Sequence, residues 1–513
     1  MTTSDTELTQ DLPEPELTSS TPSSRRWWAL GVIALAQLMV VLDASIITIA
    51  LPFAQTDLHI SDANRQWALT AYTLMFGGLL LLGGRMADYL GRRRMFLIGL
   101  IGFAASSAMA GFAWNDMSFF AGRALQGVFA AMLAPAALSL ITVTFIEHRE
   151  RARAFAVYGA VSGGGAAIGL IAGGALTEFF SWRWTLLVNT PIAIIAAIGA
   201  LTLVIRDVPT PRTGGYDLPG AITVTLGLVS VVYGFTRAAE AGWGATSTIM
   251  LFVAAAVLLT TFVVIEHRST HPLLPLRIPG DLNRGGAYLV AFIIPTAMFA
   301  MFLFLSYYFQ NTLGNSPLRA GVLFLPFPAA LIVSAGAASS LLPRFGPRPL
   351  MMTGTAAGIL GYLYLAQLDS DSTWLTHILP SELLIALGMG LVFVSMQSVA
   401  LHRIDVKDAG VASALVNTSQ QVGGSVGVAL LSTIVAQVFS NDHRSAMTLD
   451  QATGQPVPVN PEAFMAASIH SYDVAFYCGA GFMFLAFLVI TAMIRMGRHE
   501  LGDETQNAAV VAA

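Results

Sequence analysis

The chain is long and apolar: its 513 residues are 55% hydrophobic and only 11% charged, with a mean hydropathy of +0.68. A soluble domain usually carries about 25% charged residues, so this composition excludes a soluble globular protein and a disordered chain. The net charge of −4 provides no basic field to attract phosphates, which excludes a nucleic-acid binder.

Two rare residues exclude further classes. The only cysteine is Cys478, so an intrachain disulfide framework and a cysteine-rich metal site are both absent. The only lysine, Lys407, is followed by Asp408, so the Gly-Lys-Ser/Thr core of a phosphate-binding loop is absent as well. We expect neither a metal nor a cofactor. Any work must be driven by an ion gradient, a substrate gradient or a partner.

Fourteen runs of mostly apolar residues are each long enough to cross a bilayer, which takes about 20 residues per helix. The segments before and after them, residues 1–26 and 497–513, are expected to be cytoplasmic tails, the first of them disordered. In chain order the runs are 27–51, 65–84, 94–113, 118–142, 153–177, 183–205, 217–236, 247–266, 286–310, 318–342, 349–367, 378–402, 409–438 and 472–496.

The basic residues favour one orientation in the membrane. With the N-terminus in the cytoplasm, 20 of the 26 Lys and Arg residues fall on the inner side and 5 on the outer side, while Arg123 lies inside a run. This bias predicts a multi-pass protein of the plasma membrane with both termini in the cytoplasm.

Three charged residues fall inside apolar runs, where each costs about 2.5–3.5 kcal/mol on insertion scales and usually faces a cavity or a partner. Asp43, Arg123 and Glu382 all lie in the outer half of the membrane, and Asp43 and Arg123 share a similar depth. They could line a water-accessible path, or they could form a plain ion pair that locks two helices; Glu382 could also be interfacial. Because a carboxylate can exchange a proton as its surroundings change, we expect these three residues to couple transport to protons.

Glycines recur four residues apart in the fifth run, where Gly169, Gly173 and Gly174 share one helix face. Such a face lets another backbone approach closely. Helix packing is the simpler interpretation. The alternative is a bendable helix that shapes a transport path and prevents leaks.

The turn between the second and third runs reads Gly84-Arg85-Met86-Ala87-Asp88-Tyr89-Leu90-Gly91-Arg92-Arg93-Arg94. An acid in a basic inner loop can attract a helix N-terminus, and the glycines allow the turn. This string resembles the G-x-x-x-D-x-x-G-R-R/K motif of the major facilitator superfamily.

Further motifs resemble the fourteen-helix drug:proton antiporter branch of that superfamily. The branch motif G-P-x-x-G-G of the fifth span lacks its proline here, because Leu170 follows Gly169. The matching segments are 42–52 for L-D-x-T-I-V-N-V-A-L-P, 123–127 for R-x-x-Q-G, 182–191 for W-R-W-x-F-x-x-N-x-P, and 410–421 for G-x-A-S-A-x-x-N-x-x-R/Q-Q.

The resemblance implies a monomeric all-α integral membrane protein of the major-facilitator type with fourteen transmembrane helices. Six-helix bundles at 27–205 and 286–496 would flank two inserted helices within 206–285, and the bundles would rock to expose a central cavity alternately. The resemblance also implies roles for particular residues. Asp43 and Arg123 would serve proton coupling, and Gly169, Gly173 and Gly174 would seal the two bundles against each other. An inner latch near Asp408–Gly410 would be formed by Gly84, Asp88, Gly91 and Arg92.

The expected substrates are amphipathic small molecules. Aromatic and methionine side chains between 298 and 309 can hold flat apolar molecules. Alternatively, these side chains simply face the lipid. The acidic residues Asp43 and Glu382 favour cationic substrates. The candidate cavity residues are Gln126, Met301, Tyr307, Tyr308, Gln310, Asn417 and Gln420.

The sequence therefore predicts a proton-coupled multidrug efflux transporter that confers drug or antibiotic resistance. A dedicated exporter of a self-made natural product fits equally well. A nutrient uptake facilitator, a non-transporting sensor and a membrane-embedded enzyme are the alternatives from other classes. The chain contains no H-E-x-x-H zinc motif, and its histidines are not spaced as a catalytic cluster, so we expect no enzyme activity.

Overall fold

The computed structural model describes residues 23–61, 64–145, 147–204, 217–270, 272–369, 371–404, 408–443, 447–449, 456–458 and 461–497. Within these ranges the chain is helical apart from one antiparallel hairpin of β1 (Met447–Leu449) and β2 (Pro456–Pro458). Most of the predicted tails, residues 1–22 and 498–513, lies outside the described part.

Thirteen helical segments of the described part are long and apolar enough to cross a membrane. The remaining predicted run is also a helix, α14 (Pro347–Leu365), whose 19 residues begin with Pro-Arg-Pro and are therefore less apolar. An all-α membrane fold with about fourteen spans is thus confirmed.

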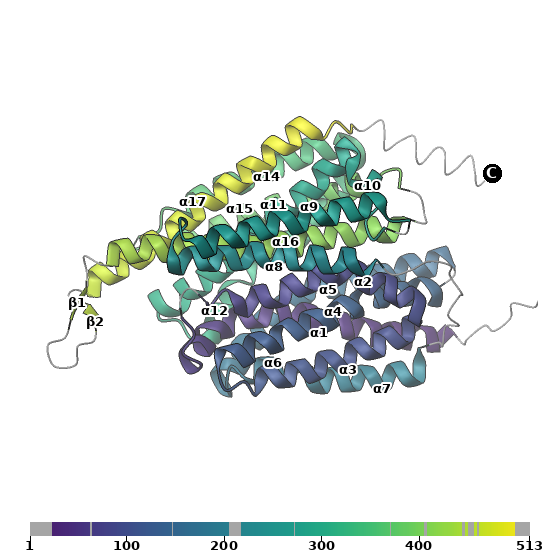
Figure 1. The fold of residues 1–513 in the computed structure, drawn as a ribbon, viewed down its shortest axis with the longest axis horizontal. Helices are drawn as coiled ribbons and strands as arrows, with labels where there is room; N and C mark the ends of the chain where they lie inside the picture. The colour runs from purple at the N-terminus through teal and green to yellow at the C-terminus, as the bar shows by residue number, and fades with distance from the viewer. Residues whose placement is uncertain are drawn as a thin grey trace, which may run out of the picture.

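The N-terminal bundle forms one half of the molecule, the lower half of Figure 1. Its sixth span is broken into two helices at Val188. The helices are α1 (Ser23–Asp57), α2 (Trp67–Leu90), α3 (Arg92–Gly111), α4 (Asp116–Thr144), α5 (His148–Phe179), α6 (Trp184–Leu187) and α7 (Asn189–Leu203).

The C-terminal bundle forms most of the other half. The predicted run 318–342 is broken near Leu325, because Pro326 and Pro328 cannot donate backbone hydrogen bonds to the preceding turn. The elements are α11 (Leu282–Tyr307), the π-helical turn η1 (Tyr308–Thr312), α12 (Pro317–Leu323), α13 (Pro326–Phe345), α14, the π-helical turn η2 (Trp374–Ile378), α15 (Leu379–Leu401), α16 (Ala409–His443) and α17 (Pro461–Met493).

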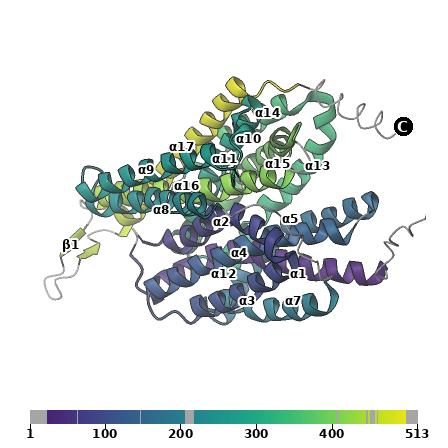
Figure 2. The same ribbon diagram turned by 45° about the vertical axis from the view of Figure 1, so that its right-hand side comes forward.

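The inserted helices α8 (Leu218–Ala241) and α9 (Thr246–Arg268) lie on one flank, followed by the short α10 (Arg277–Gly280). α8 packs between α2 and α16 (Figure 2). The Gln66 amide donates to the Thr236 hydroxyl at 2.7 Å, and the Thr433 hydroxyl donates to the Phe235 carbonyl at 2.9 Å. The insert therefore contacts both bundles.

We name the two ends of the molecule by their contents. The terminus side is where α1 begins at Ser23 and α17 ends at Met493. The hairpin side is where α1 ends at Asp57 and where β1 and β2 lie (Figure 1).

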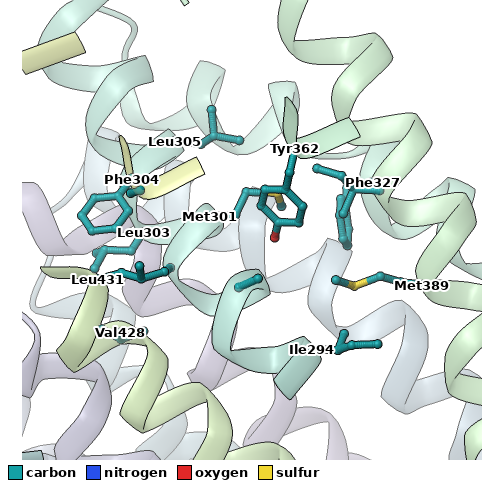
Figure 3. Close-up of a cluster of buried hydrophobic side chains, with 14 of the residues drawn as sticks. Ile294, Met301, Leu303, Phe304, Leu305, Phe327, Tyr362, Met389, Val428 and Leu431 are labelled. Atoms are coloured by element: carbon teal, nitrogen blue, oxygen red, sulfur yellow. The ribbon is translucent and has the colours of Figure 1, made fainter. Parts of the chain in front are cut away.

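Each bundle has an apolar core. In the C-terminal core, Met301 of α11 packs near Phe327, Tyr362 and Met389, while Phe304 lies beside Leu303 and Leu431 (Figure 3). This core continues across the hairpin side of the molecule to residues 47–51 of α1 and 170 of α5. The two bundles are thus fused by apolar packing on the hairpin side.

Candidate functional site

A buried ion pair lies at the centre of the N-terminal bundle. Arg123 Nη1 of α4 stands 2.6 Å from Asp43 Oδ2 of α1, and both side chains have 0% exposure. Of the two alternatives that the sequence left open for these charges, this conformation shows the ion pair. The carboxylate lies within protein, so neither lipid nor water touches it in this conformation.

Two amides complete the surroundings of the Asp43 carboxylate. Its Oδ1 accepts hydrogen bonds from Asn189 Nδ2 at 2.7 Å and from Gln126 Nε2 at 3.0 Å. Both amides also donate to the Ser107 hydroxyl, and Gln126 Oε1 accepts from Arg123 at 2.9 Å. Arg123, Gln126 and Asn189 all donate to the carboxylate, which suits the ionised form because that form only accepts.

The arginine is also held by α2. Its Nε donates to the Ala68 carbonyl at 2.9 Å, and its guanidinium lies 4.7 Å from the centre of the Tyr72 ring, a cation–π geometry. Its Nη2 and the Tyr72 hydroxyl are buried without a hydrogen-bond partner among the described residues. Both groups could therefore donate hydrogen bonds in another arrangement of the bundle.

Small residues allow the helices that carry this site to approach closely. A Cβ at Gly127 would lie 2.3 Å from the Tyr72 carbonyl oxygen of α2, and one at Gly122 would lie 2.8 Å from Ala110 of α3. α4 is therefore held between α2 and α3 with Arg123 and Gln126 facing inward. The glycine of the R-x-x-Q-G pattern is a packing requirement.

The position of Asn189 is fixed from the hairpin side. Arg183 binds Asp57 at the end of α1 at 2.9 Å and donates to the Gly111 and Ala113 carbonyls after α3. Trp182 donates to the same Asp57 at 3.1 Å. The Trp-Arg-Trp segment thus ties the start of α7 to α1 and α3.

The second part of the site is the seam between the bundles on the hairpin side. The Ser306 hydroxyl of α11 donates to the Thr48 carbonyl of α1 at 2.8 Å, and Gln310 Nε2 donates to the Ile49 carbonyl at 3.1 Å. The Tyr307 hydroxyl donates to Gln55, and the Arg65 guanidinium lies 4.6 Å from the Tyr307 ring centre.

The glycine face of α5 forms the rest of this seam. A Cβ at Gly174 would lie 2.5 Å from Leu318 Cα of α12, while Gly169 and Gly173 face Ser45 and Ile46 of α1. Of the three predicted glycines, only Gly174 therefore touches the opposite bundle, and the other two pack α5 on α1. The Glu178 carboxylate also accepts from the Leu318 backbone N–H at 3.1 Å.

Contacts loosen toward the terminus side. A Cβ at Gly159 or Gly164 of α5, or at Gly336 of α13, would meet no atom within 4 Å. Among the described residues these three glycines are unpacked, whereas the contacts of α1 and α5 with α11 and α12 lie on the hairpin side.

The predicted cavity residues do not form one group. Gln126 belongs to the Asp43 network, and Tyr307 and Gln310 belong to the seam. Tyr308 and Met301 are buried in the C-terminal core. Asn417 of α16 is exposed and donates to the Ser413 carbonyl at 3.1 Å, and Gln420 is half-buried.

The predicted latch is described only in part, because the Asp88 side chain lies outside the described residues. Gly91 has φ +93°, a conformation that requires glycine, at the turn from α2 to α3, where Arg92 begins α3. Gly84 packs on Pro135 of α4. Asp408, the expected neighbour of the latch, pairs with Arg277 of the inserted segment.

Glu382 lies apart from the Asp43 network, in the first turn of α15 in the other bundle. It has 0% exposure, and neither carboxylate oxygen has a hydrogen-bond partner among the described residues. The side chain is therefore enclosed by protein at the hairpin-side end of α15.

Sequence reasoning assigned no role to Asn189, Ser107, Thr48 or Ser306. Asn189 was visible as part of a motif, but a serine such as Ser107 or Ser306 carries no signal in an apolar helix. In the described ranges, no three His, Cys, Asp or Glu side chains come together as a metal site would require.

Two bundles of membrane-spanning helices, closed against each other on one side and built around a sealed charge pair, define a membrane transporter. The Major Facilitator Superfamily pattern matches residues 33–428, and the chain belongs to that superfamily. It is accordingly a transporter, not an enzyme, and a multi-span protein of the plasma membrane, as its bacterial relatives indicate.

Its relatives are described as resistance and export proteins. The chain is 45% identical over 495 residues to the puromycin resistance protein pur8 of Streptomyces alboniger, covering 96% of each chain. It is 38% identical to the cephamycin export protein CmcT of Amycolatopsis lactamdurans, covering 79% of this chain and 84% of that one. It is 31% identical to the multidrug efflux pump LfrA of Mycolicibacterium smegmatis, covering 88% and 89%.

The fold agrees with solved transporters. A bacterial homologue of the human lysosomal transporter Spinster, in an inward-facing and occupied conformation, superimposes with a TM-score of 0.67 at 15% identity, covering 94% of this chain and 99% of that one. This likeness shows the shared fold.

Proposed function

We propose that the protein is a proton-coupled exporter that moves amphipathic, cationic compounds out of the cell by alternating access and so confers antibiotic resistance. The Asp43–Arg123 pair is the observation that carries this proposal. It combines an ionisable carboxylate with a permanent positive charge at 0% exposure for both side chains, in the middle of a membrane protein.

The proposed orientation puts the terminus side in the cytoplasm. Among the described residues, the hairpin side carries Arg65, Arg183, Arg237 and Arg319, and most other arginines lie at the terminus-side helix ends. This distribution satisfies the positive-inside rule. A conformation closed on the hairpin side is then the one that receives a compound from the cell.

The chemistry of coupling follows from the donors around Asp43. While ionised, the carboxylate accepts from Arg123, Gln126 and Asn189. A proton on it would remove the only acidic partner that Arg123 has among the described residues. A buried charge that loses its partner costs about 3–5 kcal/mol, so protonation favours a conformation in which the guanidinium finds other acceptors or water.

The energy is sufficient for uphill export. One charge moving through 100 mV is worth about 2.3 kcal/mol, which supports a gradient of more than about tenfold for one-for-one exchange. We propose that the proton gradient alone drives the cycle, with no cofactor, and that the monomer is the working unit.

The compounds are proposed from the relatives. A puromycin resistance protein and a multidrug efflux pump support amphipathic antibiotics as substrates. A cephamycin export protein supports a second candidate, the dedicated export of one natural product made by the host cell.

One assay tests both candidates. Inverted membrane vesicles that contain the full chain are energised by a pH gradient and offered puromycin and a panel of cationic, neutral and anionic compounds. Uptake of several cationic compounds that collapses with the gradient supports the proposal, and uptake of a single compound supports the second candidate. Uptake that does not depend on the gradient contradicts proton coupling.

A further inference from the structure

Glu382 is a buried carboxylate that the Asp43 network does not use. It begins α15 on the hairpin side, and both of its oxygens are buried without a hydrogen-bond partner in the described part of the chain. An unpaired ionised carboxylate inside a membrane protein is very costly. This conformation therefore disfavours the ionised form of the side chain.

Among the described residues, no charged side chain pairs with Glu382. Met389 lies two turns further along the same face of α15, and this face points to the core around Tyr362 and Met301 (Figure 3). The backbones of α14 and α15 touch on either side of Glu382, because a Cβ at Gly361 would lie 3.0 Å from the Ser381 carbonyl oxygen and 2.6 Å from Ile385.

The elements packed on α15 carry titratable side chains at both of their ends. On α11, α13 and α14 the arginines stand at the terminus-side ends, far along the helices from Glu382. On the hairpin side, the described titratable side chains of the elements packed on α15 are Tyr307 of α11, Tyr362 and Tyr364 of α14, His377 of η2 and Asp442 of α16.

The turn η2, which leads directly into α15, is linked to the seam. Trp374 of η2, eight residues before Glu382, donates from its indole N–H to the Leu323 carbonyl at the end of α12 at 3.2 Å. α12 is also the helix that closes on Gly174 of α5. Trp374, Leu323 and Arg319 line a surface pocket of about 340 Å³ on the hairpin side, so water reaches the contact between η2 and α12.

We propose that Glu382 is a second protonation site, which must take up a proton for the hairpin side to close and which ionises when α12 moves away and water enters. The sign follows from linkage: closure binds a proton, so acidity on the hairpin side favours the closed conformation and alkalinity favours the open one. The proposed function gives this step a use, since protons arriving from outside would return the exporter to the conformation that loads its compound.

Two measurements on the full chain in lipid nanodiscs, without any compound added, test this. Spin labels on Met117→Cys and Leu375→Cys, in a Cys478→Ser background, report the separation of the two bundles on the hairpin side; both positions are about two-thirds exposed or more. One linked proton changes the open-to-closed ratio by up to about tenfold per pH unit. We expect the wild type to open as pH rises, and Glu382→Gln to remain closed with less than about a twofold change across the same range.

The infrared band of a protonated carboxylic acid provides the second readout. It should be present in the wild type near neutral pH, be lost in Glu382→Gln and persist in Asp43→Asn. The matched control Asp371→Asn removes an exposed hairpin-side acid and should open with pH like the wild type. A wild type without pH dependence, a Glu382→Gln variant that still opens with pH, or a band that survives in Glu382→Gln overturns the proposal. Neither readout needs transport, so a failure here is distinct from a failure of Asp43 coupling.

Discussion

The Ser306 hydroxyl donates its hydrogen bond to the one carbonyl of α1 that Pro52 leaves free. In a helix the Thr48 carbonyl would accept from the N–H of residue 52, and proline has none. The Ser306 hydroxyl of the opposite bundle donates to this carbonyl oxygen instead, at 2.8 Å. The proline that ends the first-span motif thus creates an acceptor for the contact between the bundles.

Removing this contact should favour opening of the hairpin side. A net hydrogen bond contributes about 1 kcal/mol, so Ser306→Ala should shift the closed-to-open ratio about fivefold toward open. Pro52→Ala restores an N–H that competes for Thr48, and it should have an effect in the same direction. Because both changes act on one carbonyl, the double variant should be non-additive in spin-label distances; full additivity would refute the shared acceptor.

A side chain at Gly174 should force the seam apart. The added Cβ of Gly174→Ala would lie 2.5 Å from Leu318 Cα, so α5 and α12 must separate. We expect greater labelling of hairpin-side cysteines by a membrane-impermeant thiol reagent and slower export. Gly164→Ala is the matched control on the same helix, since its Cβ meets nothing within 4 Å. Equal labelling of the two variants would show that this contact does not hold the seam.

The amide of Asn189 should tune the coupling carboxylate. Asn189→Ala removes one of the two amide donors to Asp43 Oδ1 and leaves the Gln126 donor in place. A lost bond to a charged group is worth about 1.5–3 kcal/mol, so the pH at which export is half-maximal should shift upward by one unit or more. An unchanged pH profile with a reduced maximal rate would instead indicate a purely structural role.

Arg123→Lys should be a poor replacement. The arginine contacts Asp43 and Gln126 through one nitrogen and the Ala68 carbonyl through another, while its planar face covers Tyr72. A lysine ammonium has no planar fork to reproduce these contacts. We expect at least about a tenfold loss of gradient-driven export, equal to about 1.4 kcal/mol. Arg237→Lys, on an exposed pair with Glu240, should export normally.

The sequence predicted the spans and the central pair because the cost of charge in a membrane leaves few explanations for Asp43 and Arg123. It did not predict that α17 begins at Pro461 and that α16 continues to His443. The apolar pattern marks only the part of a helix that lies within the bilayer, so helical extensions beyond it give no such signal. The described part of residues 439–471, between the last two predicted runs, contains helix and a hairpin. The split near Leu325 depends on proline, a signal that was present but unused.

The site was predictable only where a residue is out of place in lipid. Glycine spacing placed Gly169, Gly173 and Gly174 on one face, yet only the packing shows which of them meets the other bundle. Tyr307 and Gln310 have the chemistry of cavity residues, and their role in the seam depends on the backbone carbonyls of α1, which no side-chain pattern reveals.

The most direct test follows protons and compound together through Asp43. Proteoliposomes that contain the full chain and an internal pH dye are given puromycin under a pH gradient. The wild type should move protons opposite to the compound, and Asp43→Asn should bind puromycin but neither accumulate it nor move protons. If Asp43→Asn exports against a gradient with the same proton movement as the wild type, this carboxylate does not couple the protein to protons.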